Sequence, residues 1–313
     1  MLELKRSTVS VTEGIRQNLD NQKAEFIGPF FTTVQFALAG NDSEGLVYGA
    51  IDTKENYYLH WKEVCEELNP EDRHLLRLTQ PIRELAADTD TRLDKNIIEL
   101  LNKERFLELI HDFIVFDRGV KKMPRPNQYF GVKAAQEQVR QRQGGIIWHT
   151  QGSGKSLTMV WLTKWILENT PSARVLIITD RTELDEQIEK VYNGVEETIH
   201  RTKSGADLLN QLNIPSPRLL CSLVHKFGRK EEVSAKDVDS YINDLKKGLP
   251  SDFSPKGDLY VFVDECHRTQ SDKLHQGMKA IMPDALFIGF TGTPLLKKDK
   301  RRSETQTAQV LLT

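Results

Sequence analysis

Residues 145–156 of the chain read GIIWHTQGSGKS and residues 259–267 read LYVFVDECH, and these two stretches decide the fold. In the first, the short apolar strand Ile146–Trp148 runs into a glycine-rich loop, and the helix-favouring stretch Leu157–Leu167 follows. A strand, a loop and a helix in this order are the setting of a phosphate-binding loop. Glycines let backbone N–H groups close around phosphate oxygens, and the helix N-terminus adds a partial positive charge. The stretch therefore predicts a site for the phosphates of a nucleotide.

The loop supplies the candidate nucleotide-binding residues Gly152, Ser153, Gly154, Lys155 and Ser156. We expect Lys155 to reach the β- and γ-phosphates and the Ser156 hydroxyl to hold magnesium. His149 stands where the strict pattern G-x-x-x-x-G-K-[ST] has its first glycine. For this loop taken alone, a chance glycine-serine turn is therefore the alternative.

The second stretch is an apolar strand, Leu259–Val263, that ends in two adjacent carboxylates. We expect Asp264 to coordinate magnesium through water, and Glu265 to orient or deprotonate the water that attacks the γ-phosphate. An exposed acidic strand end would explain the charges but not their position directly after an apolar run. The two stretches together predict an ATP-hydrolysing site that uses ATP and Mg²⁺.

Length and composition limit the class of protein. A chain of 313 residues can hold about two domains, and 28% charged with 38% hydrophobic residues is a globular composition. The net charge is −2, so any DNA contact must come from local patches. Three scattered cysteines (Cys65, Cys221 and Cys266) form neither a disulfide framework nor a zinc pattern. This cysteine pattern predicts a reducing cytoplasm, and apolar runs only of strand length, with no signal-peptide stretch, predict a protein without membrane contact.

From about residue 134 onward, strand and helix patterns alternate. The expected strands are nearly continuous apolar runs, as in a parallel sheet buried on both faces; they are Ile146–Trp148, Arg174–Thr179, Arg218–Val224, Leu259–Val263 and Ala285–Phe290. Helical stretches such as Leu157–Glu168 and Glu183–Tyr192 lie between them. This alternation predicts a doubly wound α/β domain whose ligand sites lie at the carboxyl ends of the strands.

The first part of the chain has a different pattern. The expected elements there are a strand at Leu2–Lys5, a helix at Val11–Phe26, strands at Phe31–Leu38 and Gly45–Ile51 with a turn at Ala39–Asp42, and a helical pattern at Asn96–Val115. The polar, proline-bearing stretch 119–127 resembles a linker. We therefore expect a first domain with a helical connector over 1–118, a linker over 119–127 and the α/β domain over 128–313.

The order and spacing of these segments resemble the restriction (R) subunit of type I restriction-modification enzymes, essentially over the whole chain. Such subunits join a nuclease of the PD-(D/E)xK type to a two-lobed superfamily-two DNA translocase. The resemblance implies a RecA-like first motor lobe with a parallel sheet, preceded by a partial nuclease domain of α/β type. In RPNQYF (125–130), Gln128 would read adenine, because an amide can both donate and accept.

Further residues take their expected roles from the same resemblance. Thr291 and Thr293 lie in TGTP (291–294), which would couple the nucleotide state to DNA, and His267 would contact the phosphate-sensing elements. The segments Asp180-Arg181 and Ser222–Phe227 would line the DNA path. The basic cluster KKDKRR (297–302) would either contact DNA phosphates or form a solvated loop.

The tripeptide Glu3-Leu4-Lys5 is similar to the E-x-K half of the nuclease motif. Residues two apart on a strand face the same side, so Glu3 and Lys5 can converge on one site. Glu3 would ligate magnesium, and Lys5 would position the attacking water or stabilise developing charge. The family's Q-x-x-x-Y element has an imperfect match either at Gln17 or at Gln22, and the sequence leaves this choice open. Three further segments of the chain resemble the nuclease domain of this family: Val11–Asn21, Phe30–Gln35 and Trp61-Lys62.

The resemblance implies an ATP-dependent type I site-specific deoxyribonuclease that couples ATP hydrolysis to translocation and cleavage of double-stranded foreign DNA. Its partners would be the methyltransferase (M) and specificity (S) subunits. The chain begins two residues before Glu3 and stops about twenty residues after TGTP, so the upstream aspartate and the second lobe with its arginine finger are missing. This predicts ATP binding with little or no turnover. The alternatives are an inactive remnant or docking module, and a superfamily-two helicase without a nuclease, which Glu3 and Lys5 on opposite faces would favour.

Overall fold

The computed structural model describes residues 1–63, 73–117, 119–149, 152–179, 199–223, 235–249, 253–264, 269–292 and 309–312, together with Ser251 and Cys266. Two compact units form along the chain, Met1–Phe130 and Gly131–Thr313. The division falls inside helix α6, Pro126–Arg140. The stretch 119–127, which resembled a linker, contains strand β6, Val120–Lys122, and the start of α6.

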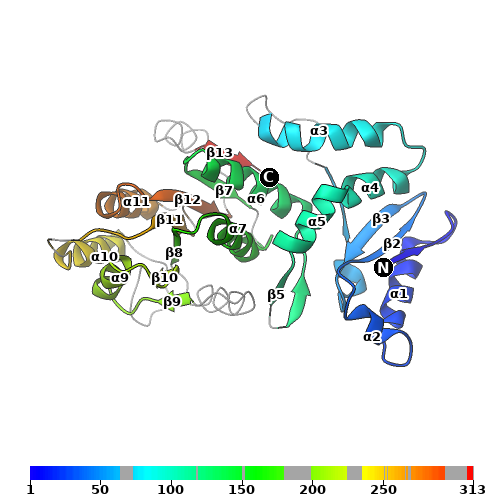
Figure 1. The fold of residues 1–313 in the computed structure, drawn as a ribbon, viewed down its shortest axis with the longest axis horizontal. Helices are drawn as coiled ribbons and strands as arrows, with labels where there is room; N and C mark the ends of the chain where they lie inside the picture. Colours follow the sequence, from blue (N-terminus) through cyan, green and yellow to red (C-terminus); the bar gives the residue numbers. More distant parts are fainter. Residues whose placement is uncertain are drawn as a thin grey trace. The chain divides into compact units, whose positions relative to one another are not determined.

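The first unit is built on a four-stranded sheet with the order β1-β2-β3-β4 (Figure 1). Its strands are β1 (Leu2–Leu4), β2 (Ala37–Asn41), β3 (Gly45–Gly49) and β4 (Leu59–His60). The pair β1–β2 is parallel, and the other two pairs are antiparallel. Helix α1, Val11–Asn21, packs Val11 and Ile15 against Ala39 and Val47 of the sheet. Ser10 caps this helix, because its side chain accepts a hydrogen bond from the Thr12 amide.

The remaining described elements of this unit are helices and the hairpin β5–β6. They are α2 (Gly28–Phe31), the 3₁₀ turn η1 (Glu55–Tyr57), α3 (Arg73–Ala87), α4 (Arg92–Leu101), α5 (Lys103–Asp112), and the antiparallel strands β5 (Val115–Asp117) and β6. The buried guanidinium of Arg105 forms an ion pair with Glu63 and lies over the rings of Trp61, Tyr129 and Phe130, with 5.1 Å from its carbon to the Trp61 ring centre. This charged group and these aromatic rings form one core of the unit.

Two predicted elements of the first unit are wrong in their bounds. The expected helix Val11–Phe26 ends at Asn21, and the expected strand Phe31–Leu38 begins only at Ala37. The hydroxyls of Thr32 and Thr33 donate to the carbonyls of Pro29 (2.7 Å) and Phe30 (2.9 Å), and such local bonds compete with strand pairing.

Two further details of the same region differ from the expectation. The turn expected at Ala39–Asp42 lies at residues 42–44, directly before Gly45, whose φ is +86°. The helical pattern Asn96–Val115 is divided between α4 and α5, because the backbone of Asn102 is not helical (φ −47°, ψ 130°).

The second unit contains a seven-stranded sheet in which every neighbouring pair is parallel, with the order β13-β7-β12-β11-β8-β10-β9. The strands are β7 (Gly145–Trp148), β8 (Ala173–Thr179), β9 (Ile199–Arg201), β10 (Leu219–Leu223), β11 (Asp258–Val263), β12 (Leu286–Thr291) and β13 (Gln309–Leu312). The predicted parallel α/β domain is confirmed.

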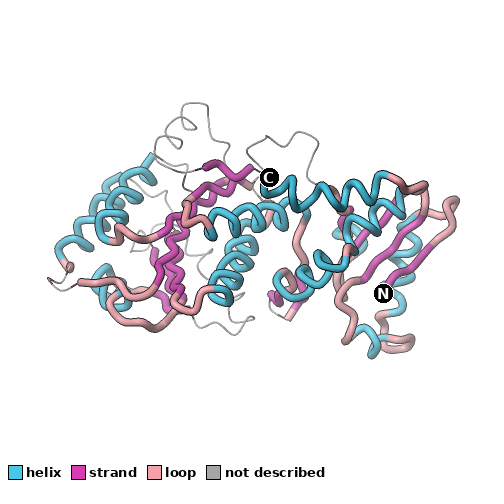
Figure 2. The backbone as a smooth tube through the Cα atoms, turned by 45° about the horizontal axis from the view of Figure 1, so that its top comes forward, coloured by secondary structure: helices cyan, strands magenta, loops and turns pink. Residues whose placement is uncertain are grey.

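Helices cover both faces of this sheet, as Figure 2 shows for the cyan helices on either side of the magenta strands. They are α6, α7 (Lys155–Asn169), α9 (Gly205–Leu212), α10 (Ala235–Lys247) and α11 (Thr269–Ile281). Helices α9, α10 and α11 bury leucine, isoleucine and methionine side chains against β8, β10 and β11. Helix α7 is buried along most of its length, from Ser156 to Leu167. Among the described helices, none is both long and apolar enough to cross a membrane.

Candidate functional site

The carboxyl ends of β7, β12 and β11 lie side by side at one edge of the second sheet. Strand β12 lies between the other two, with Trp148 opposite Thr291 and Val263 opposite Gly289. All three strands are parallel, so the residues that follow them, His149 and Asp264, and the last residue of β12, Thr291, gather at this edge. Ligand sites of open α/β sheets occur at such an edge.

The glycine-rich loop enters the first turn of α7 with two left-handed glycines. Gly152 has φ +78°, and Gly154 has φ +85° and ψ 40°, conformations that residues with a Cβ rarely adopt. Gly154 is the N-cap residue of α7, and the helix begins at Lys155. A helix N-terminus directs N–H groups and a partial positive charge toward an anion. Around Gly152, no atom of the described residues lies within 4 Å of the position that a Cβ would take.

Lys155 and Asp264 meet at this edge from different elements. The Lys155 Nζ lies 3.9 Å from the Asp264 Oδ1, and the Asp264 side chain is only 2% exposed. The Asp264 backbone N–H donates to the Ile178 carbonyl on β8 (3.0 Å), which holds the turn after β11 against the sheet. The structure therefore brings together the cation of the loop and the first carboxylate of the acidic strand end.

The residues present fit a magnesium-bound nucleotide. The Asp264 carboxylate and the Ser156 hydroxyl are oxygen donors, which Mg²⁺ prefers. Lys155 and the left-handed glycine loop at the start of α7 provide the cation and the backbone amides that phosphate needs. A cation beside a buried carboxylate also keeps the charge of the site balanced when no phosphate is bound.

Two close contacts of the backbone hold the site elements together. The His149 N–H donates to the Thr291 carbonyl (3.0 Å), which extends the β7–β12 pairing past the end of β7. The Cys266 N–H donates to the Phe290 carbonyl (3.0 Å), and a Cβ on Gly289 would lie 2.6 Å from the Cys266 sulfur. Glycine at position 289 therefore leaves room for the Cys266 side chain against β12.

A second group of predicted residues meets in the first unit. The Lys5 Nζ lies 3.2 Å from the Glu3 Oε1 and also donates a hydrogen bond to the Gln17 Oε1. Both ionic side chains are 20% exposed. They therefore share one face of β1, and α1 brings Gln17 to the same place. A cavity of about 700 Å³ adjoins Lys5 and Gln17; it is lined by Leu4, Lys5, Arg6, Val9, Glu13, Arg16, Gln17 and Asp20.

The two glutamines that could match the Q-x-x-x-Y element, Gln17 and Gln22, have different contacts in the structure. Gln17 contacts Lys5 at the cavity. The side-chain oxygen of Gln22 instead accepts a hydrogen bond from the Asp52 N–H (2.7 Å), in a loop of the same unit. Gln17 is therefore the glutamine that belongs to the Glu3 and Lys5 group.

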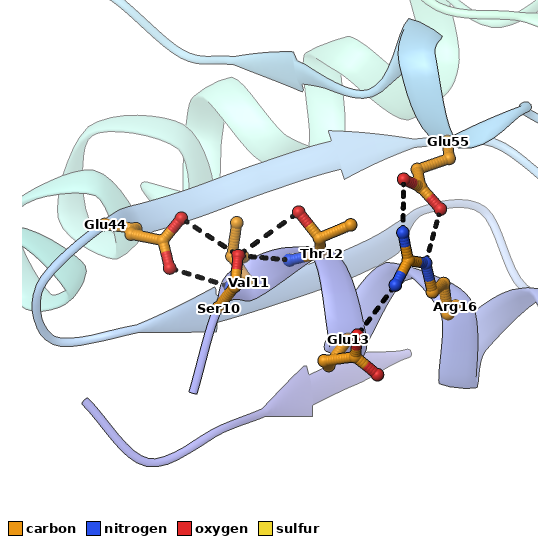
Figure 3. A network of polar contacts seen from close by, with 7 residues as sticks. All are labelled: Ser10, Val11, Thr12, Glu13, Arg16, Glu44 and Glu55. Atoms are coloured by element: carbon orange, nitrogen blue, oxygen red, sulfur yellow. Dashed lines mark hydrogen bonds and ion pairs between the residues drawn. The ribbon is translucent and has the colours of Figure 1, made fainter. Parts of the chain in front are cut away.

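A network of polar contacts holds helix α1 in place beside this cavity (Figure 3). Glu44 accepts hydrogen bonds from the Val11 N–H (2.9 Å) and the Ser10 hydroxyl (3.4 Å). The Val11 N–H, followed by the Asn41 amide, holds the pKa of Glu44 below its usual value. One turn further along, Arg16 donates to Glu55 (2.9 Å) and to Glu13 (2.8 Å). These contacts fix the helix that presents Gln17.

The other predicted residues belong to the first unit, lie on other strands of the second sheet, or fall outside the described part. Gln128 is buried in the first turn of α6, in the first unit, where its side-chain oxygen accepts a hydrogen bond from the Arg125 N–H (2.8 Å). Ser222 is buried near the end of β10. The described residues do not include Glu265, His267, Thr293, Asp180, Arg181, residues 224–227 or the basic cluster 297–302.

Sequence reasoning missed the site residues Thr158 and Gly289. Thr158 is fully buried on α7, and its Oγ1 lies 3.3 Å from the His149 Nδ1. No pattern links residues 149 and 158, because their contact depends on how α7 folds back on β7. A glycine inside the apolar run of β12 was a signal, since glycine within a strand often marks a close approach of another backbone.

An all-parallel sheet, a left-handed glycine loop at the start of α7 and a carboxylate at the end of β11 define a RecA-like P-loop nucleotide-binding domain. The family model for the SWI2/SNF2 ATPase matches residues 127–310, which is more than half of the chain. The chain belongs to the SWI2/SNF2 ATPase family.

Individual proteins similar to this chain include endonuclease subunits of type I restriction enzymes. A Methanocaldococcus jannaschii protein, provisionally named as the subunit of MjaIXP, is 28% identical over 272 residues, covering 82% of this chain and 25% of that protein. The SsaAORF53P subunit of Staphylococcus saprophyticus is 24% identical over 314 residues, covering 99% of this chain and 30% of that protein. The resemblance to type I restriction subunits is confirmed. The chain spans less than a third of the length of these curated relatives.

Among solved structures, the chain is similar to the Sulfolobus solfataricus SWI2/SNF2 ATPase core in complex with double-stranded DNA. The identity is 13% and the TM-score is 0.41, and the match covers 61% of this chain and 36% of that one.

Proposed function

We propose that the second unit binds magnesium-ATP and hydrolyses it as the first motor lobe of a type I restriction enzyme R subunit, which moves double-stranded DNA. The observation that carries this proposal is the meeting of Lys155 and Asp264, 3.9 Å apart, beside the left-handed loop at the start of α7. A cation and a carboxylate at this edge are the two charges that a magnesium-bound triphosphate requires. The family to which residues 127–310 belong supports the same reaction.

Each residue of the site has a role in this proposal. Lys155 binds the β- and γ-phosphates, and the loop N–H groups around Gly152 and Gly154 donate hydrogen bonds to the phosphate oxygens. Ser156 and Asp264 hold Mg²⁺, which supplies positive charge to the developing transition state. Glu265 orients the attacking water.

The proposed roles of the remaining residues come from the resemblance to type I restriction subunits. Gln128 binds adenine, and Ser153 contributes to the phosphate loop. Thr291 and Thr293 couple the state of the nucleotide to DNA, and His267 contacts the phosphate-sensing elements.

We further propose that the first unit is the nuclease part of the same enzyme, with the M and S subunits as partners of the whole protein. The specific observation in favour is that Lys5 contacts both Glu3 and Gln17, and that Lys5 and Gln17 line a cavity of about 700 Å³. A helicase without a nuclease would place no constraint on these three side chains. In the nuclease, Glu3 ligates magnesium and Lys5 positions the water that attacks the phosphodiester.

Isothermal titration of the chain with magnesium-ATP tests the motor site. Lys155→Ala should weaken binding by at least about a hundredfold, because a hydrogen-bonded charge pair in a buried site contributes about 2–5 kcal/mol. Lys164→Ala is the matched control, since Lys164 lies on the same helix and pairs with Glu168 at 3.8 Å. Asp264→Asn should remove the dependence of binding on magnesium. Equal affinities of the Lys155 and Lys164 variants would refute the assignment.

Titration with Mn²⁺, followed by electron paramagnetic resonance, tests the nuclease site. In an Asp264→Asn background, Glu3→Gln should weaken the remaining Mn²⁺ site by about tenfold or more, because one charged ligand is lost. Glu13→Gln is the control, because Glu13 lines the same cavity but is 54% exposed and paired with Arg16. The same affinity in all three proteins would show that Glu3 is not a metal ligand.

A further inference from the structure

His149 occupies the first-glycine position of the phosphate-loop pattern, but its backbone does not adopt a conformation that requires glycine. Among the described residues, the non-glycine residues with positive φ are Asp52 and Arg142, so the backbone of His149 is ordinary. The residue is 1% exposed, so an imidazole ring is buried at the start of the loop, where the strict pattern has no side chain. A buried polar ring in such a place needs polar neighbours.

The ring reaches the first turns of α7. The His149 Nδ1 and the Thr158 Oγ1 lie 3.3 Å apart, and Thr158 is fully buried. The Thr158 N–H donates to the Gly154 carbonyl (3.3 Å), and the Thr158 hydroxyl lies 3.5 Å from the same oxygen. At its other end, the His149 backbone N–H donates to the Thr291 carbonyl (3.0 Å). His149 therefore connects the end of β12 to the residue that caps α7.

We propose that His149 is a positioning residue of the phosphate site, acting through Thr158 to hold Gly154 and the start of α7, and linking that turn to Thr291. This inference rests on the proposed nucleotide site. A loop with two left-handed glycines has many accessible conformations. If one loop conformation is already held before the nucleotide binds, less conformational entropy is lost on binding, and the affinity is higher. The link to β12 then lets a phosphate at Gly154 affect the hydrogen bond at Thr291.

Removing the Thr158 hydroxyl is the first test, because valine keeps the shape of threonine. Thr158→Val should weaken magnesium-ATP binding by about three- to tenfold, as the loss of one buried hydrogen bond predicts. Thr158→Ser restores the hydroxyl and should bind within about twofold of the unaltered chain. Thr163→Val is the matched control, a second fully buried threonine on α7, whose hydroxyl has no hydrogen-bond partner among the described residues. It should leave the affinity unchanged.

A double-mutant cycle tests whether the two side chains act through their contact. His149→Gly should weaken binding to a similar extent, and adding Thr158→Val to it should produce no further loss. Additive losses would overturn the inference, as would unchanged affinity in both single variants. Thermal unfolding of each variant without nucleotide shows that the fold is kept.

Hydrogen exchange distinguishes a positioning role from a purely structural one. Nucleotide should slow exchange of the His149 amide, which bonds to Thr291, and Thr158→Val should reduce this nucleotide-dependent slowing. An equal slowing in Thr158→Val and the unaltered chain would overturn the link to β12. If Lys155→Ala loses magnesium-ATP binding while Thr158→Val and His149→Gly keep it, the positioning role of His149 is refuted and the nucleotide site is not. If the unaltered chain does not bind magnesium-ATP, the proposed function falls as well.

Discussion

Replacing Gly152 by alanine should weaken nucleotide binding at small cost to the fold. A residue with a Cβ at φ +78° costs about 1–2 kcal/mol in the left-handed region. No steric cost adds to this, because no atom of the described residues lies within 4 Å of the new methyl group. The unfolding transition of the second unit should therefore fall by roughly 2–8 °C. The methyl group stands where phosphate oxygens must approach the loop, so affinity for magnesium-ATP should fall by at least about tenfold, or 1.4 kcal/mol.

Thermal unfolding with and without magnesium-ATP, together with titration calorimetry, separates the two effects. Gly119→Ala is the matched control: its φ is +79°, and again no described atom lies within 4 Å of the added methyl group. This glycine lies in the turn between β5 and β6, so the substitution has the same backbone cost in the first unit and should leave the affinity unchanged. If Gly152→Ala bound magnesium-ATP as tightly as Gly119→Ala, the placement of phosphate against Gly152 would be refuted.

Two further predictions concern the first unit. Arg105→Met should lower the free energy of unfolding by about 3–5 kcal/mol, because it leaves the Glu63 carboxylate, 7% exposed, without its counter-charge. In urea denaturation, the double variant Arg105→Met with Glu63→Gln should recover much of this loss, and no recovery would contradict the argument. The pKa of Glu44 is held below its usual 4.5, mainly by the Val11 N–H, so its stabilisation is complete above pH 4.5 and is lost as the pH falls through the folded pKa. Glu44→Gln should therefore make unfolding of this unit less sensitive to pH below 4.5; identical pH profiles of the two proteins in chemical denaturation would argue against this.

The central strands of the second sheet could be predicted from sequence because each is a nearly continuous apolar run. The predicted strands Ile146–Trp148 and Leu259–Val263 differ from β7 and β11 by one residue at one end. Burial on both faces requires apolar residues throughout, and this leaves a clear signal. Strands β9 and β13, at the edges of the sheet, were not predicted, because edge strands pair on one side only and carry polar residues such as His200 and Gln309.

The side-chain contacts of both sites were predictable only where they lie within one element. The alternation of strand residues predicted that Glu3 and Lys5 share a face, and the structure places them 3.2 Å apart. The contact of Gln17 with Lys5 depends on how α1 packs on the sheet, and the sequence left two glutamines possible. The contact of His149 with Thr158 likewise arises from tertiary packing, which no local pattern records.

The order of strands in the second sheet has a consequence for synthesis of the chain on the ribosome. Strand β7, which leads into the phosphate loop, pairs with β12 and β13. Trp148 can therefore form its strand pairings only after the ribosome has synthesised Thr291 and Leu312. At a synthesis rate of about 5–20 residues per second, the interval between Trp148 and Thr291 is roughly 7–30 s. Strands β8 and β10 lie closer in sequence and can pair earlier. We expect the phosphate loop to be the last part of this sheet to become ordered, so nascent chains that end before Leu286 should not retain nucleotide.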